Sequence, residues 1–128
     1  NKISEMVIPE TLHIASGTGK DISSEYEITT GNRYTNNSGS EQYVRVIVSA
    51  TGIAGGGTYN IRVTVINGTD EYEVYNDDFD VSSGSTKIRK VSISSLLLGN
   101  NEDLAVYITG LAGDTNVDVE AKVMRGVA

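Results

Sequence analysis

The stretch GGGTYNIRVTVINGTDEYEVY, residues 55–75, contains the pattern that decides the fold. From Thr58 to Ile66 apolar residues alternate with polar ones, and a second strand-like run follows after Asn67-Gly68. Alternation with a period of two places the apolar side chains on one face of a strand. Asn and Gly both tolerate positive φ, so this pair predicts a two-residue type I′ turn. The stretch therefore predicts a β-hairpin with one buried face.

The three glycines that begin this stretch raise the possibility of a phosphate-binding loop. Such a loop leads into a helix, and its P-loop form adds a lysine followed by Ser or Thr. Here Gly55, Gly56 and Gly57 lead into a strand pattern, and no lysine follows. The glycines therefore predict a bend at the end of a strand, where freedom of the backbone is useful.

The rest of the chain repeats the strand pattern. Alternation is clear over 42–50, 58–66, 103–108 and 117–123, and weaker over 12–16, 25–30, 71–79 and 86–93. Turn residues separate these runs, and only residues 94–98 are a candidate for a helical turn. About eight short strands at regular spacing predict an all-β fold, an antiparallel β-sandwich of jelly-roll type. We expect one domain over residues 12–128 and an N-terminal arm over residues 1–11, which Pro9 interrupts.

Composition excludes several classes of function. The 128 residues include 17 acidic and 10 basic residues, for a net charge of −7. An acidic chain does not favour nucleic acid or anionic lipid, because both require a basic surface. No apolar run approaches the roughly 20 residues of a membrane span, and with no cysteine there is no thiol for a disulfide or a metal.

A catalytic site is not indicated, and we expect neither an enzyme nor a bound cofactor. His13 is the only histidine, and the alternation places it opposite Leu12 and Ile14, facing solvent or a partner subunit. No nucleophile elbow or paired-histidine zinc motif occurs. Paired carboxylates of the glycosidase type stay possible among 17 acids, so a small acidic hydrolase with a buried carboxylate pair is a third hypothesis.

The acidic run from Asp70 to Asp80 has two interpretations. A solvated strand and turn is the simpler one. A calcium site is the other, because Asp77, Asp78 and Asp80 offer carboxylate oxygens, to which Asp114 with Asn116 could add. Two glycosylation sequons, at Asn36 and Asn67, also fall in predicted turns.

Seven tyrosines and no tryptophan give the chain an unusual aromatic balance. The period places Tyr43, Tyr75 and Tyr107 on the outward faces of their strands. There they are candidates for stacking on a sugar or for anchoring a protein interface. The alternative is that a second sheet or a neighbouring subunit covers them.

Three segments suggest a family: RYTNNSGSEQYVRVIVSATG, GGGTYNIRVTVINGT and DLAVYITGLAGDTNVDVEAKV. Their polar, glycine-rich turns and short Val/Ile strands resemble the small all-β accessory modules of tailed-bacteriophage virions, which serve in decoration, fibres and receptor binding. The resemblance implies a jelly roll or sandwich that assembles as a symmetric oligomer, often a trimer, on the extracellular virion surface. It supplies no motif from which a site residue can be transferred.

The leading hypothesis is a non-enzymatic structural or attachment module of a virion, associated with the capsid or with the tail or fibre, and working as a homo-oligomer. Its partners would be a capsid or tail protein or a host-surface glycan. The second hypothesis is a monomeric carbohydrate-binding module that uses exposed tyrosines and loop Asn or Asp residues. The two hypotheses differ in the oligomeric state that they predict.

Overall fold

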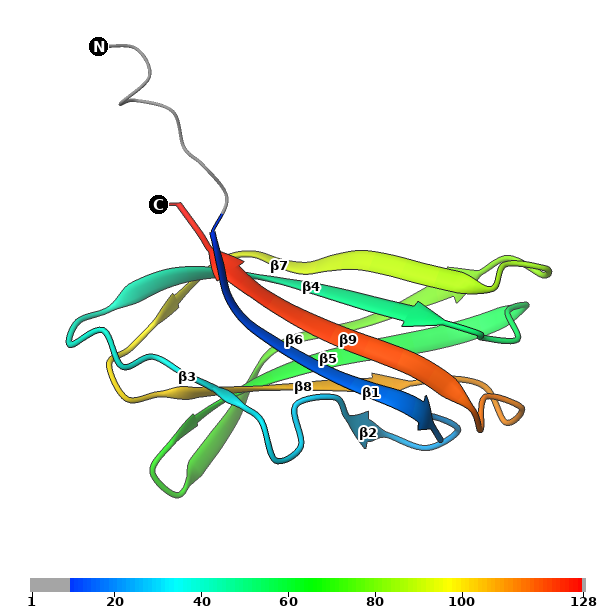
Figure 1. Ribbon diagram of the computed structural model, residues 1–128, viewed down its shortest axis with the longest axis horizontal. Coiled ribbons are helices and arrows are strands. Elements are labelled where there is room, and N and C mark those ends of the chain that lie inside the picture. Colours follow the sequence, from blue (N-terminus) through cyan, green and yellow to red (C-terminus); the bar gives the residue numbers. More distant parts are fainter. Residues whose placement is uncertain (1–9, 128) are drawn as a thin grey trace, which may run out of the picture.

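The computed structural model describes residues 10–127, which form nine strands in two antiparallel sheets and no helix (Figure 1). Sheet A consists, in spatial order, of β1 (Thr11–Lys20), β9 (Val117–Arg125), β4 (Gln42–Thr51) and β7 (Lys87–Leu98). Sheet B consists of β2 (Tyr26–Glu27), β8 (Asp103–Thr109), β5 (Gly57–Asn67) and β6 (Asp70–Val81), and β3 (Tyr34–Thr35) also pairs with β8. The strands of both layers run along the long axis of the molecule (Figure 1).

The order of the strands is that of a jelly roll. Strands β2 and β3 pair one after the other with β8, so they are two halves of one strand interrupted by a loop. With that strand counted once, the chain changes sheet at every connection except the β5–β6 hairpin. Two four-stranded sheets wound in this way form the eight-stranded, double-sheet jelly roll. The predicted all-β sandwich is confirmed.

The core lies between the sheets and consists mainly of β-branched side chains. Each long strand contributes the residues that the alternation predicts, for example Val44, Val46 and Val48 of β4 and Ile61 and Val63 of β5, all fully buried. Full burial of one such side chain stabilises the fold by about 1.5–3 kcal/mol. The alternation thus supplies the main driving force for pairing the two sheets.

The β5–β6 hairpin is confirmed, but its turn lies one residue later than predicted. Asn67 pairs with Asp70, so Gly68 and Thr69 form the two-residue loop. Gly68 has φ +63°, and Thr69 does not share a positive φ. Positive φ at the first central residue alone is the property of a type II′ turn, which favours glycine there. The turn is therefore of type II′ rather than type I′.

The glycine bend leads into β5, as the sequence predicts. Gly55 and Gly56 have φ +71° and +80°, in the left-handed region. A Cβ atom on Gly55 would lie only 2.6 Å from the carbonyl oxygen of Ser85. Glycine is therefore required here by both backbone conformation and space.

Residues 94–98 do not form a helical turn, because β7 continues through them to Leu98. Leu96 pairs with Val44 and Leu97 with Tyr43. Register shifts in the β4–β7 ladder break the alternation of β7, which hides its strand character in the sequence.

Of the predicted N-terminal arm, residues 1–9 lie outside the described residues. Thr11 begins β1 and pairs with Met124. The carbonyl of Glu10 accepts a hydrogen bond from the Arg125 backbone N–H, and its carboxylate accepts one from Arg125 Nε at 2.6 Å. Residues 10 and 11 therefore belong to the edge of sheet A.

Two buried polar side chains organise the loops. The Asn36 amide donates to the carbonyls of Ser40 and Leu98, both at 2.9 Å, and is fully buried. Asp114 accepts from the backbone N–H of Ala54 and of Leu111, each at 2.8 Å. The sequon at Asn36 is thus occupied by internal hydrogen bonds, whereas Asn67 is exposed.

Candidate functional site

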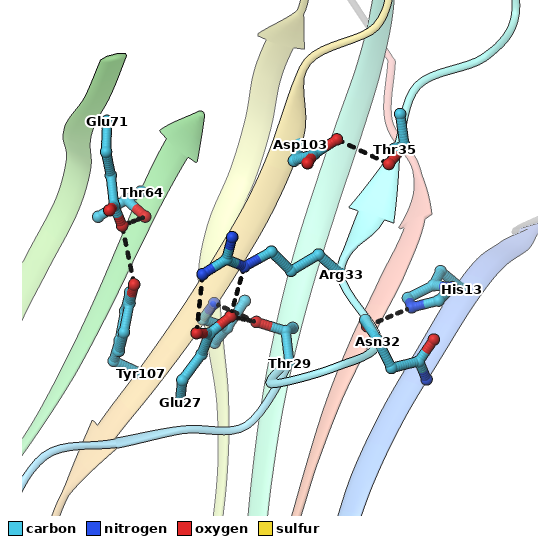
Figure 2. A network of polar contacts seen from close by, with 11 residues as sticks. His13, Glu27, Thr29, Asn32, Arg33, Thr35, Thr64, Glu71, Asp103 and Tyr107 are labelled. Atoms are coloured by element: carbon cyan, nitrogen blue, oxygen red, sulfur yellow. Dashed lines mark hydrogen bonds and ion pairs between the residues drawn. The ribbon is translucent and has the colours of Figure 1, made fainter. Parts of the chain in front are cut away.

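The two outer faces of the sandwich are the surfaces on which a function can be built, and they differ in chemistry. The outer face of sheet B holds a polar network across β2, β8, β5 and β6. One part of it surrounds Tyr107, whose hydroxyl donates to Glu71 Oε2 at 2.8 Å. Thr64 donates to the same oxygen at 2.7 Å, and both bonds appear in Figure 2. The Arg62 guanidinium lies 4.3 Å from the centre of the Tyr107 ring, in cation–π contact.

Two arginines on this face are held by glutamates of the chain. Arg62 donates to both carboxylate oxygens of Glu25, at 2.9 and 2.8 Å. Arg33 does the same to Glu27, at 2.8 and 3.0 Å, as Figure 2 shows. Thr29 adds a hydrogen bond to Glu27 at 2.7 Å. Paired N–H donors from arginine match the geometry of a carboxylate, so both glutamates are fixed in position.

The network keeps its carboxylates ionised. Hydrogen bonds from Arg62 lower the pKa of Glu25, and hydrogen bonds from Thr64 and Tyr107 lower that of Glu71. Burial would raise the pKa of Glu27, but the hydrogen bonds from Arg33 and Thr29 outweigh it and leave the pKa below its ordinary value. A general acid of the glycosidase type needs a raised pKa instead. The three groups are therefore ionised hydrogen-bond acceptors rather than proton donors.

The acidic side chains proposed for calcium lie on β6 and do not converge. Asp78 accepts from Asn60 at 2.7 Å and Asp80 from Thr58 at 2.8 Å, both on the outer face of sheet B. Asp77 lies on the opposite side of the strand, 3.1 Å from Lys90 Nζ of β7. Residues 10–127 contain no group of three or more acidic or histidine side chains placed to hold a metal ion. Asp114, which with Asn116 was expected to add ligand oxygens, instead accepts hydrogen bonds from the backbone N–H groups of Ala54 and Leu111.

The three candidate tyrosines lie in different surroundings. Tyr107 is half-buried in the sheet B network described above. Tyr75 faces the core side of β6 rather than outward, because a register shift between Val63 and Thr64 changes the parity of the strand. Tyr43 does point outward, from β4 of sheet A, and 37% of it is exposed. It borders a shallow hollow lined also by Gln42 and Arg125.

His13 differs from its expected orientation. It shares a face of β1 with buried Ala15, and Ile14 is the residue that points outward, 47% exposed. The His13 Nε2 nitrogen donates to the carbonyl of Asn32 at 2.8 Å (Figure 2). Its ring lies 5.8 Å from that of Tyr34. The histidine therefore ties the edge strand to the loop between β2 and β3.

The outer face of sheet A carries exposed apolar side chains. Ile14 of β1 and Val91 of β7 lie in one row across the sheet, and Lys122 of β9 and the buried Ile47 of β4 lie between them. Val91 is 43% exposed. A second apolar pair, Tyr43 and Leu97, lies further along the same face, and Leu97 is 44% exposed.

Charge is divided between the sheets. The strands of sheet A carry seven basic and two acidic residues, whereas those of sheet B carry one basic and eight acidic residues. The signal in the sequence is the contrast between Lys87-Ile88-Arg89-Lys90 and the acidic run of residues 70–80. This contrast indicates a division of charge between the sheets only once β7 is assigned to sheet A and β6 to sheet B.

Comparison with known proteins does not place the chain in a family. No protein-family model and no curated protein matches the chain. The chain is similar to a structure of infectious bursal disease virus Gx strain, with a TM-score of 0.47 and 12% identity over 94% of this chain and 32% of that chain. It thus spans about a third of that protein's length.

Two further structures resemble this chain. The globular domain of zebrafish complement 1qA matches with a TM-score of 0.41 and 14% identity, over 91% of each chain. The virus-like particle of extra small virus, from the prawn Macrobrachium rosenbergii, matches with a TM-score of 0.37 and 16% identity, over 93% of this chain and 80% of that one. Neither virus is described as a tailed bacteriophage, so that resemblance stays a prediction.

No helix in residues 10–127 is long and apolar enough to cross a membrane.

Proposed function

We propose that this chain is a non-enzymatic structural module of a virion that works by assembling with copies of itself. The observation that carries the proposal is the outer face of sheet A, where Ile14, Val91 and Leu97 are each more than 40% exposed. Apolar side chains gathered on one face of a sheet gain free energy when a partner removes them from water, at about 25 cal/mol per Å².

The opposite face supports the same proposal by contrast. The two arginines on the outer face of sheet B, Arg62 and Arg33, already bind carboxylates of the same chain, so that face presents polar groups rather than an apolar surface. A sandwich with one polar face, whose arginines are paired, and one apolar face is suited to a structural role. The jelly-roll order is also an architecture that viral capsid proteins use, although lectins and cupins share it.

The finer part of the proposal concerns the place and the partner. We infer a capsid-decoration or tail- or fibre-associated module on the outside of the particle, working as a closed oligomer such as a trimer. Its partners would be a capsid or tail protein, or a glycan of the host surface. Repetition of the module would multiply weak contacts into avidity.

The experiment is a measurement of molar mass by light scattering on a sizing column. The unmodified chain should elute as a multiple of 13.6 kDa at tens of micromolar. Leu97→Ser combined with Val91→Thr should shift it toward monomer. Tyr72→Ser is the matched control, since Tyr72 is similarly exposed, at 48%, but pairs with the buried Val65 and so lies on neither outer face. A monomer at every concentration would overturn the proposal.

A carbohydrate-binding module is the second candidate, and the surroundings of Tyr43 favour it. An exposed aromatic ring beside the polar groups of Gln42 and Arg125 is an arrangement on which a sugar can stack and form hydrogen bonds. A glycan array should then give at least one hit that Tyr43→Ala abolishes and Tyr72→Ala leaves unchanged. A blank array with folded protein would remove this candidate.

A further inference from the structure

We propose that copies of this chain associate head to tail, with the outer face of sheet A of one copy docking on the acidic outer face of sheet B of the next. The inference rests on the proposed function, because it names the two surfaces through which the proposed self-assembly occurs. It follows from how charge and apolar area are distributed over the two sheets.

The first surface is cationic and apolar. Four basic side chains alternate with buried residues of sheet A and therefore point outward: Arg45, Lys87, Arg89 and Lys122. None of these four belongs to an ion pair within residues 10–127. They surround the exposed Ile14, Val91 and Leu97, and only Asp118 and Glu120 oppose them on that face.

The second surface is anionic and lies along β6, the edge strand of sheet B. Asp78 and Asp80 point outward there, and their hydrogen-bond donors are the neutral side chains of Asn60 and Thr58. Glu71 is likewise held by the hydroxyls of Thr64 and Tyr107. These partners position the three carboxylates without neutralising their charge.

Charge complementarity selects the pairing of the two faces. Two cationic faces repel each other, and so do two acidic ones, whereas a cationic face on an acidic face brings opposite charges together. Burial of Ile14, Val91 and Leu97 supplies attraction, and the charges set orientation. The two faces lie on opposite sides of the sandwich, so every copy offers one of each. Such a heterologous contact gives a ring if the rotation closes and a stack if it does not.

The test uses two complementary charge reversals. One variant reverses the first surface with Arg89→Glu and Lys122→Glu, and the other reverses the second with Asp78→Lys and Asp80→Lys. In each variant the reversed side chains face like charges on the other surface, so its self-association should weaken by more than about tenfold. An equimolar mixture restores both complementary contacts, and sedimentation should show assembly again. The control is Lys20→Glu with Ser83→Glu and Thr115→Glu, which changes net charge as much as the first variant but places the new charges at the end of β1 and in two loops, outside the outer face.

A thermal melt of each variant establishes that it folds. If a reversal variant does not fold, the neutral pairs Arg89→Gln with Lys122→Gln and Asp78→Asn with Asp80→Asn take its place, and each pair should weaken association of the chain. The inference is supported if each reversal variant alone associates weakly, the control associates normally and the mixture of the two variants assembles.

The failure of this inference is distinguishable from that of the proposed function. An unmodified chain that forms an oligomer whose mass neither reversal changes would overturn the head-to-tail contact and leave self-assembly standing. Reversal variants that weaken association but do not recover when mixed would also overturn the pairing of these two faces. A monomeric unmodified chain would overturn both.

Discussion

The outer faces of the two sheets are built from the same alternating strands but end in opposite states. On sheet B, Arg62 and Arg33 bind Glu25 and Glu27, and Tyr107 binds Glu71, so that polar groups find partners within the chain. On sheet A, Ile14 and Leu97 are exposed, and the outward basic side chains form no ion pair within residues 10–127. The difference shows that alternation decides which side of a strand is buried. The types of the outward residues then decide whether their side chains find partners within the same sheet.

The largest expected effect separates a leucine of the core from a leucine on the outer face of sheet A, called here the open face. Leu104 of β8 is fully buried between the sheets, whereas Leu97 is 44% exposed. Leu104→Ala should lower the free energy of unfolding by about 2–5 kcal/mol, because it removes apolar contacts and leaves a cavity. Leu97→Ala should change it by less than about 0.5 kcal/mol. Urea unfolding, monitored by circular dichroism, measures both, and equal costs would contradict the assignment of the open face.

The second contrast is between Arg62, which has ion-pair partners, and Arg89, which has none among residues 10–127. Arg62→Met should lower the free energy of unfolding by about 1 kcal/mol, since it removes a solvent-screened pair with Glu25 and the contact with Tyr107. Arg89→Met, on the open face, should leave unfolding within about 0.5 kcal/mol. Both costs are measured by urea unfolding in the monomeric variant that carries Leu97→Ser and Val91→Thr. A larger cost at Arg89 than at Arg62 would show that sheet A is the self-contained face.

The smallest expected effect is on how the stability of the folded chain falls at acid pH. The pKa values of Glu25, Glu27 and Glu71 are lower in the folded chain than their ordinary value of 4.5. The folded state therefore binds fewer protons than the unfolded state. Their contribution is fully present above pH 4.5 and is lost as pH falls through the lowered values. Glu27→Gln should flatten this loss in melts from pH 6 to pH 3, and an unchanged slope would contradict it.

Much of the fold could be predicted from the sequence because its signals are local. The buried residues of β4, β5 and β9 follow the alternation, and Gly55 marks a bend that only glycine permits. The predicted orientations are wrong where one extra residue in a strand reverses which side chains point inward. Tyr75 points inward because of a register shift opposite Val63, and residues 94–98 lose their alternation for the same reason. A bulge depends on the partner strand, which the sequence does not mark.

The candidate site was less predictable, because it depends on contacts between distant residues. Tyr107 was a candidate by period, but its partner Glu71 and the nearby Arg62 reach it through strand pairing across the sheet. Asn36 lies in a turn, as predicted, yet it is buried by contacts with Leu98. The division of charge between the sheets becomes visible only when β7 and β6 are assigned to different layers.

The most direct test of self-assembly through the open face is the molar mass of the unmodified chain, measured by light scattering from about 1 to 100 micromolar. The account predicts a species of two or more copies of 13.6 kDa that dissociates on dilution or when Leu97 and Val91 are made polar. A mass of 13.6 kDa across the whole range would contradict it.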